Sequence, residues 1–221
     1  MKLACPAFEQ EFAQYREHLR KEIHCFRDSV SVLRQISDHK YDHLHEINLA
    51  PGFFHVTEEA LFNIVILWAH KLFDEKGERG LFHFLTFIEY NREWLSVKEL
   101  QRRRSYSDDY WMLKDRKPIT LDSINSDREK IRSLVVLPSI KLRRDKFHGH
   151  FDRQYFDDRS RLQSEAEITW GDIEAAGDVM GSVLNDYSSD FDGSFFSWSA
   201  PDDLGRLLNT AQRGATNANT G

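Results

Sequence analysis

The segment from Phe8 to about His45 most constrains how this chain folds, because it contains neither proline nor glycine. Its apolar residues recur every three or four positions, at Phe8, Phe12, Tyr15, Leu19, Ile23, Phe26 and Val30. This spacing places one apolar stripe along an α-helix of many turns. Such a stripe must be covered by other elements, so the segment predicts a domain built around one long helix.

The rest of the chain continues the helical pattern. Pro51-Gly52 is expected to end the first segment, and Thr57 to cap a second helix that reaches Asp74 and is the most buried one. Further helices are expected at 81–88, from Ser96 to Arg104, from Thr120 or Asp122 to Leu134, from Pro138 into residues 142–152, and from Thr169 to Tyr187. No alternating strand pattern persists, although residues 194–199 are ambiguous. We therefore predict an all-α antiparallel helical bundle with long N-terminal helices.

The chain is expected to form one helical domain with a C-terminal extension. Its 221 residues, of which 40% are hydrophobic, can bury one core. We assign residues 1–190 to the domain and residues 191–221 to the extension. The extension is predicted to contain a short helix from Pro201 to about Asn209 and a disordered polar tail from Gln212 onward.

Charge and cysteine content exclude several classes of protein. The net charge of -6 argues against a protein that coats nucleic acid, so a polyanion site must be local. Cys5 and Cys25 lack the spacing of a zinc site or a disulfide framework, which predicts reduced thiols. Glu9 interrupts the N-terminus before a signal peptide could form, and the longest apolar patch, Ala60 to Trp68, is too short to span a bilayer. We expect a cytoplasmic protein without a membrane partner.

Two clusters outside the main motif have chemical potential. His39, His43 and His45 offer spacing for metal ligands, with His70 or His83 as further ligands, but no carboxylate or thiol pattern completes the set. A solvated helix face is the alternative, and we predict no metal and no cofactor.

The second cluster is the basic run Arg102, Arg103 and Arg104, followed by Tyr106, Tyr110 and Trp111. It suits RNA phosphates and unpaired bases, or a solvated helix end.

The densest group of chemically active side chains lies between Leu142 and Asp152. Its members are Arg143, Arg144, Asp145, Lys146, His148 and His150. An arginine can hold a phosphate through its planar fork of donors, and an imidazole can transfer protons near neutral pH. Arg144 and His148 lie on one face of a straight helix, as do Arg143 and His150, whereas Arg144 and His150 do not. Geometry alone leaves the register open, and a helix whose arginines pair with surface carboxylates is the structural alternative.

Arg144-Asp145 followed by His150 resembles the Rx4-6H signature of HEPN domains. The wider sequence resembles the AbiU2-like branch of abortive-infection proteins, over about Phe8 to Tyr187. The matching features occur in the same order: Leu67-Trp68-Ala69-His70-Lys71-Leu72-Phe73-Asp74, then Gly80-Leu81, then the Leu-Arg-Arg-Asp-Lys segment that ends at Asp152.

The resemblance implies a homodimeric bundle in which two motif helices meet across a cleft and form one ribonuclease site. In active members a histidine and an arginine assist attack of a ribose 2′-hydroxyl on the adjacent phosphate, with no metal required. An acidic or amide residue follows the arginine in the family pattern, which selects Arg144, Asp145 and His150 as the catalytic residues. Residues His148, Arg143 and Lys146 are auxiliary candidates.

The implied partners are RNA, a second copy of the chain, and an antitoxin or other protein encoded nearby. A HEPN protein that binds RNA, nucleotides or a partner without catalysis is the alternative. Gly149 replaces the alanine that often precedes the histidine in this branch. Because glycine lowers helix stability by about 1 kcal/mol relative to alanine, we expect the motif helix to bend or end there.

Overall fold

A computed structural model describes residues 2–114, 116–149, 152–199 and 201–218 of the chain. Every regular element in these residues is a helix, which confirms the predicted all-α fold. The α-helices are α1 (Cys5–His39), α2 (Leu44–Ile47), α3 (Pro51–Phe73), α4 (Leu81–Asn91), α5 (Val97–Arg104), α6 (Leu121–Arg132), α7 (Leu137–Arg143), α8 (Arg153–Asp157), α9 (Ser160–Glu165), α10 (Trp170–Asp192) and α11 (Asp203–Ala218). The 3-10 turns η1 (Arg92–Leu95) and η2 (Trp111–Leu113) and the π-helical turn η3 (Arg144–His148) complete the set.

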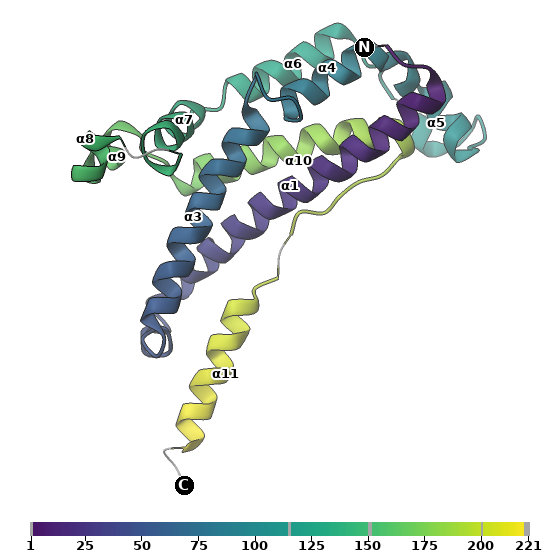
Figure 1. Ribbon diagram of the computed structural model, residues 1–221. Helices are drawn as coiled ribbons and strands as arrows, with labels where there is room; N and C mark the ends of the chain where they lie inside the picture. The colour runs from purple at the N-terminus through teal and green to yellow at the C-terminus, as the bar shows by residue number, and fades with distance from the viewer. Residues whose placement is uncertain (1, 115, 150–151, 200, 219–221) are drawn as a thin grey trace.

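Helix α1 is the central element, and it packs against α3 and α10 (Figure 1). The predicted apolar stripe is its buried face, with Phe8, Phe12, Leu19 and Ile23 fully buried. The Phe12 ring stacks on Phe191 of α10 with their centroids 4.2 Å apart. The stripe therefore joins the N-terminal and C-terminal parts of the chain into one core.

The start of α3 differs from the sequence prediction. Pro51 does not end the preceding helical segment but occupies the first turn of α3, where a missing backbone N-H costs nothing. Thr57 consequently lies inside the helix and caps nothing. The expectation that the helix from Thr57 to Asp74 is the most buried one is also wrong, because five of its residues are buried, compared with 11 of the 23 residues of α10.

Capping residues fix the boundaries of two helices that frame the core. Thr120 and Thr169 form capping boxes at the starts of α6 and α10, as their sequence positions predicted. Gly193 ends α10 with a φ of 77°, a left-handed conformation that suits glycine. Within the described residues, no helix combines the length and apolar character needed to cross a membrane.

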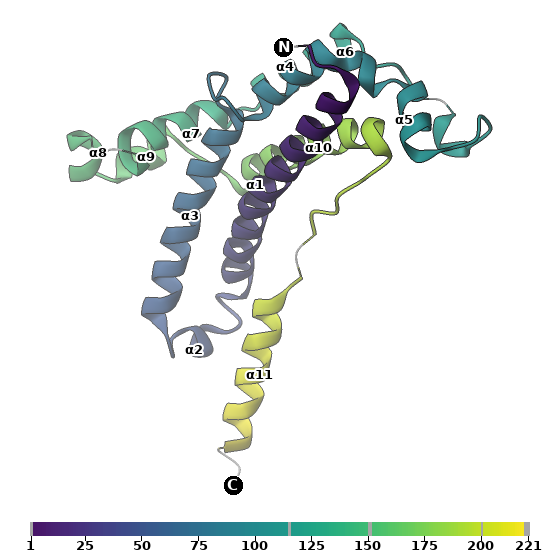
Figure 2. The ribbon, with the colours of Figure 1, turned by 45° about the vertical axis from the view of Figure 1, so that its right-hand side comes forward.

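The C-terminal helix is longer than predicted. Helix α11 continues beyond Asn209 to Ala218, so the sequence prediction of a disordered tail from Gln212 is wrong for residues 212–218. It runs past the tip formed by α2 and the start of α3 (Figure 2). Leu208 packs there with Ile36, Ile47 and Phe54 in a small second core. This contact gives the helix an anchor that its polar composition did not reveal.

Candidate functional site

The predicted motif lies where α7 ends in a wider helical turn. The Gly149 amide donates to the Arg144 carbonyl over 2.7 Å, five residues back, so the turn η3 is π-helical. A Cβ at Gly149 would lie 2.8 Å from that same carbonyl oxygen, which explains why glycine stands there. The predicted end of the motif helix at Gly149 is thereby confirmed. His150, the predicted catalytic histidine, lies outside the described residues.

Arg144 borders a cavity of about 440 Å³ between the end of α3 and α7. Its Nε lies 2.9 Å from Asp145 Oδ1, within ion-pair range but without the alignment of a hydrogen bond. The guanidinium makes no hydrogen bond to any other described residue. His70, Lys141 and Lys76 line the same cavity. The arrangement leaves a planar donor group available to an anion.

Arg143 has a structural role that the sequence did not indicate. Its Nε donates to the Ala166 carbonyl over 2.7 Å and its Nη2 to the Leu162 carbonyl over 3.0 Å. The guanidinium also lies over the Phe62 ring, 5.5 Å from the centroid. Burial lowers the pKa of this arginine. Arg143 therefore holds the end of α9 against the motif helix and does not face the Arg144 cavity.

His148 is packed on the other side of the motif, in a cavity of about 570 Å³. Its Nδ1 contacts the side-chain oxygen of Asn63, and its ring packs edge-on against Phe62 and Phe147. Burial, assisted by the positive charge of Arg143, lowers the pKa of His148 to about 4. The imidazole is thus neutral at physiological pH and serves as a packing and hydrogen-bonding group.

His148 should make the stability of the protein depend on pH. Its pKa is about 4 in the folded state and about 6.5 in the unfolded state, so only the unfolded state binds the proton between these values. The contribution is present above pH 6.5 and lost as the pH falls, by on the order of 2 kcal/mol for a partly buried group. Urea unfolding of wild type and His148→Gln from pH 4 to pH 7.5 measures it. The variant should show a flatter profile.

The control for this measurement is His55→Gln, because the His55 side chain is 71% exposed. Other titrating groups, including Asp190, contribute equally to wild type and variant and cancel in the difference. A His148→Gln profile parallel to that of wild type would contradict the assignment of His148 as a buried neutral imidazole.

The remaining charged residues of the motif are paired locally. Lys146 Nζ donates to Asp152 Oδ2 over 2.8 Å, and this hydrogen bond raises the pKa of Lys146. The pair ties η3 to the start of α8. Asp145 lies beside Arg144, as described above, so it can orient the guanidinium. Of the predicted catalytic residues, the structure brings Arg144 and Asp145 together.

The arginine run at the end of α5 lies against acidic residues of α1 and α5. Arg102 pairs with Glu9 and Glu99, and Arg103 Nε donates to Glu9 over 2.9 Å. Arg103 also donates to the Trp94 carbonyl over 2.5 Å, and its side chain is only 7% exposed. Arg104 donates to the Tyr106 hydroxyl over 3.4 Å. RNA binding by this run stays a prediction, and the contacts of Arg103 make it part of the fold.

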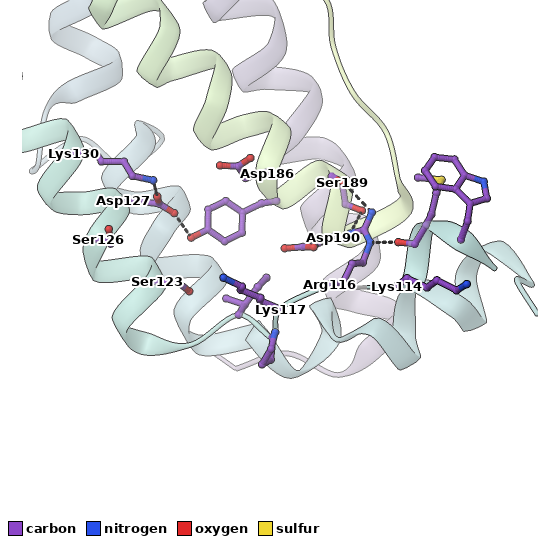
Figure 3. A pocket seen from close by; sticks show the side chains of 15 residues that line it. Lys114, Arg116, Lys117, Ser123, Ser126, Asp127, Lys130, Asp186, Ser189 and Asp190 are labelled. Atoms are coloured by element: carbon purple, nitrogen blue, oxygen red, sulfur yellow. Dashed lines mark hydrogen bonds and ion pairs between the residues drawn. The ribbon is translucent and has the colours of Figure 1, made fainter. Parts of the chain in front are cut away.

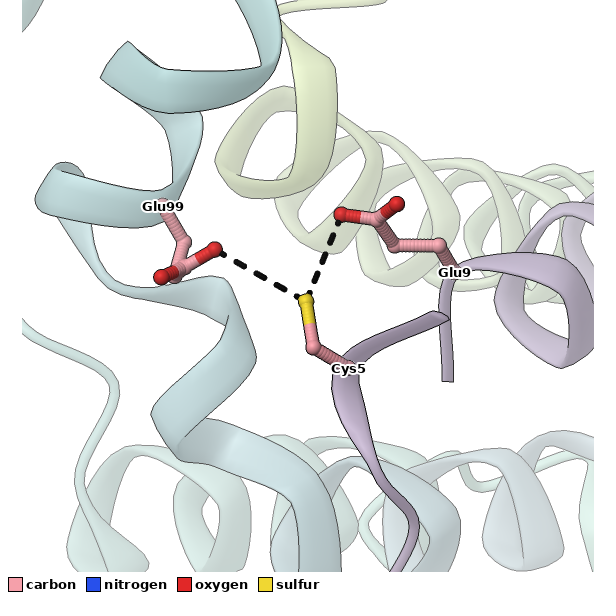
Figure 4. Close-up of side chains that lie close together, drawn as sticks. All are labelled: Cys5, Glu9 and Glu99. Carbon is pink, nitrogen blue, oxygen red and sulfur yellow. Dashed lines mark hydrogen bonds between the residues drawn. The ribbon is translucent and has the colours of Figure 1, made fainter. Parts of the chain in front are cut away.

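Figure 4 shows the acidic cluster beside this run, where Cys5 lies between Glu9 and Glu99. Its Sγ lies 3.6 Å from Glu9 and 3.9 Å from Glu99. Among the described residues, this is the one group of three whose ligand atoms lie close enough to hold a metal ion. Both glutamates already pair with Arg102. The guanidinium therefore balances the negative charge that would attract a metal ion to this group.

The histidines considered as metal ligands occupy separate environments. His39 Nε2 lies 3.0 Å from Asp202 Oδ2, next to the start of α11. His43 is buried beside Glu46, His45 is exposed, and His83 contacts the Tyr15 hydroxyl. In the part of the chain that the structure describes, these histidines do not gather into a ligand set.

Another cavity, of about 790 Å³, lies between α6, α10 and residues 111–114 and 116–119 (Figure 3). Four of its charged groups form two ion pairs, Arg116 with Asp190 and Lys130 with Asp127. Tyr187 and Lys130 both donate to Asp127, and Arg116 donates to Asp190 over 2.8 Å. Burial still raises the pKa of Asp190 to about 6, because it outweighs the effect of Arg116. These internal pairs fasten α6 and the segment around Arg116 to α10.

His70 is the residue of the motif cavity that the sequence did not connect with Arg144. The sequence presents it as a further candidate metal ligand and as part of the segment from Leu67 to Asp74 that resembles the family, without a role in the site. A signal existed, however, because Asn63 and His70 are seven residues apart and share one face of α3. Asn63 contacts His148, and His70 lines the same cavity as Arg144. The face of α3 that carries Asn63 and His70 therefore lies against the motif segment.

Comparison with known proteins gives one family. The sequence profile of the AbiU2 family of HEPN domains matches residues 9–211. No curated protein and no solved structure gives a match. The matched region runs from the first turns of α1 into α11 and includes the motif segment with its cavity. This chain therefore belongs to the AbiU2 family of HEPN domains.

Proposed function

We propose that this protein is a metal-independent endoribonuclease of the HEPN type, acting as a toxin or phage-defence effector. The observation that carries the proposal is the position of Arg144, which borders a cavity together with His70 and two lysines and whose one ion pair among the described residues is with the adjacent Asp145. Family membership supplies the second support. Asp145 orients the arginine, and His150 completes the proposed catalytic set.

The proposed reaction uses a nucleophile that the RNA itself carries. The ribose 2′-oxygen forms a bond to the adjacent phosphorus, and the bond from phosphorus to the 5′-oxygen breaks. His150 accepts the proton of the 2′-hydroxyl, while Arg144 stabilises the charge that builds up on the phosphate oxygens. The products are a 2′,3′-cyclic phosphate and a 5′-hydroxyl. DNA lacks the 2′-hydroxyl and is not a substrate.

The proposed active form is a homodimer in which two motif segments form one site, as the family resemblance implies. A composite site removes the requirement that Arg144 and His150 of one chain share a helix face. The turn that starts at Arg144 is π-helical and not a straight α-helix, so α-helical spacing does not fix which face its side chains occupy. An antitoxin encoded nearby is the proposed regulator.

A labelled RNA strand incubated with purified protein in EDTA tests the proposal. We expect cleavage to persist in EDTA and to leave 2′,3′-cyclic phosphate ends. A matched strand with a single 2′-deoxyribose at the cleaved nucleotide should resist cleavage at that position alone. Failure of wild type to cleave RNA, dependence on a divalent metal, or cleavage at the deoxyribose would each reject the proposal.

The alternative is a HEPN domain that binds RNA, a nucleotide or a partner protein without cleaving RNA. The net charge of -6 and the internal pairing of Arg102 and Arg103 favour a restricted binding surface over general RNA binding. Salt-dependent RNA binding by both wild type and His150→Ala, with no new ends formed by either protein, would support this alternative.

A further inference from the structure

The proposed reaction requires two proton transfers, and Arg144, Lys146 and His148 of the motif segment are not suited to the second. One group must accept the 2′-hydroxyl proton, and another must donate a proton to the departing 5′-oxygen. Arg144 cannot act as the donor, because a guanidinium does not lose its proton in proteins. Lys146 is held by Asp152, and His148 is neutral and buried against Asn63.

His70 is placed to fill this role. It lies in the last turn of α3, is half-buried, and lines the same cavity of about 440 Å³ as Arg144. Its imidazole makes no hydrogen bond or ion pair to any residue in the described ranges. A histidine kept for structure usually has a partner, as His148 has Asn63 and His39 has Asp202.

The charges around His70 favour a phosphate in this cavity. Lys141 of α7 and Lys76 line it, and neither lysine has an ion pair with a described residue. Two carboxylates also line the cavity, but Asp74 accepts from the Lys76 backbone amide and Glu75 pairs with Arg132. Asp74 keeps its negative charge, but Lys76, Lys141 and Arg144 outnumber it in the lining of the cavity, which favours an external anion there.

From this geometry we propose that His70 is a catalytic residue of the ribonuclease site, the general acid that protonates the departing 5′-oxygen. His150 takes the 2′-hydroxyl proton, Arg144 and Lys141 hold the phosphate, and His70 delivers its proton as the bond from phosphorus to the 5′-oxygen breaks. The cycle closes when solvent returns a proton to His70 and removes one from His150. This inference rests on the proposed ribonuclease function.

The test uses two RNA substrates that differ at one atom. In the second substrate, sulfur replaces the bridging 5′-oxygen at the cleaved linkage, and a thiolate leaves without being protonated. We expect His70→Ala to lower kcat for the oxygen substrate by about 100-fold, the usual size of a general-acid contribution. Cleavage of the sulfur substrate by the same variant should stay close to that of wild type.

Three controls separate proton transfer from other roles. Lys141→Ala should slow both substrates equally, because phosphate binding is the same for each. His55→Ala, on the same helix but 71% exposed, should cleave both substrates as wild type does. His70→Gln retains a polar side chain of similar size and should show the same substrate dependence as His70→Ala. Thermal unfolding of each variant verifies that it is folded.

The outcomes are distinguishable. If His70→Ala cleaves both substrates normally, or slows both equally, His70 is not the general acid, while the ribonuclease function stands. If wild type cleaves neither substrate, the proposed function fails and this inference fails with it.

Discussion

Arg144→Ala is expected to lower kcat/KM for RNA cleavage by about 10²- to 10³-fold, the range seen when one charge-stabilising donor is removed. The guanidinium is the group proposed to stabilise the negative charge on the phosphate in the transition state. Its one described ion pair is with the adjacent and partly exposed Asp145. The free energy of unfolding should therefore change by no more than about 0.5 kcal/mol.

Steady-state cleavage of one defined RNA strand, together with urea unfolding of each variant, measures both effects. Arg153→Ala is the matched control, because Arg153 lies just beyond the motif and its side chain is 93% exposed. Arg144→Lys should recover part of the activity, since it restores the charge without the planar fork of donors. Undiminished cleavage by Arg144→Ala would remove Arg144 from the active site.

Phe12→Ala is expected to lower the free energy of unfolding by about 4 kcal/mol, as for other buried phenylalanines truncated to alanine. The side chain is fully buried in α1, and its ring stacks on Phe191 and contacts Phe8 and Phe84. Truncation would leave a cavity where α1 meets both α4 and α10. The whole bundle, and not one helix, should lose stability.

Urea unfolding followed by far-UV circular dichroism measures this change. Phe53→Ala is the matched control, because Phe53 is 67% exposed at the start of α3, and it should change the free energy of unfolding by less than about 1 kcal/mol. Equal destabilisation by the two substitutions would mean that Phe12 does not occupy the centre of the core.

Helix positions followed from the sequence wherever a local signal determined them. The spacing of apolar residues located α1, and the hydroxyl groups of Thr120 and Thr169 located the starts of α6 and α10. The prediction for Pro51 is wrong, because a proline is equally consistent with the end of one helix and the first turn of the next. Helix α11 extends further than predicted, since its anchor at Leu208 depends on a contact with distant residues.

The family resemblance singled out Arg144, but the sequence did not indicate the contacts that the side chains around it make. Spacing made Arg143 and Arg144 equivalent, whereas the fold directs Arg143 to the carbonyls of Leu162 and Ala166 and Arg144 to a cavity. Burial lowers the pKa of His148 to about 4, so this histidine does not titrate near neutral pH. The spacing of residues in a sequence does not indicate burial of this kind. His70 joined the site only through the packing of α3 against α7, a contact between segments far apart in the chain.

The π-helical turn between Arg144 and Gly149 limits what a helical wheel can say about this segment. Its hydrogen bond closes five residues back, so the turn holds about one residue more than an α-helical turn. A period of 3.6 residues therefore does not assign helix faces correctly from Arg144 to His148. Arguments from spacing in this segment have to use the wider π-helical period.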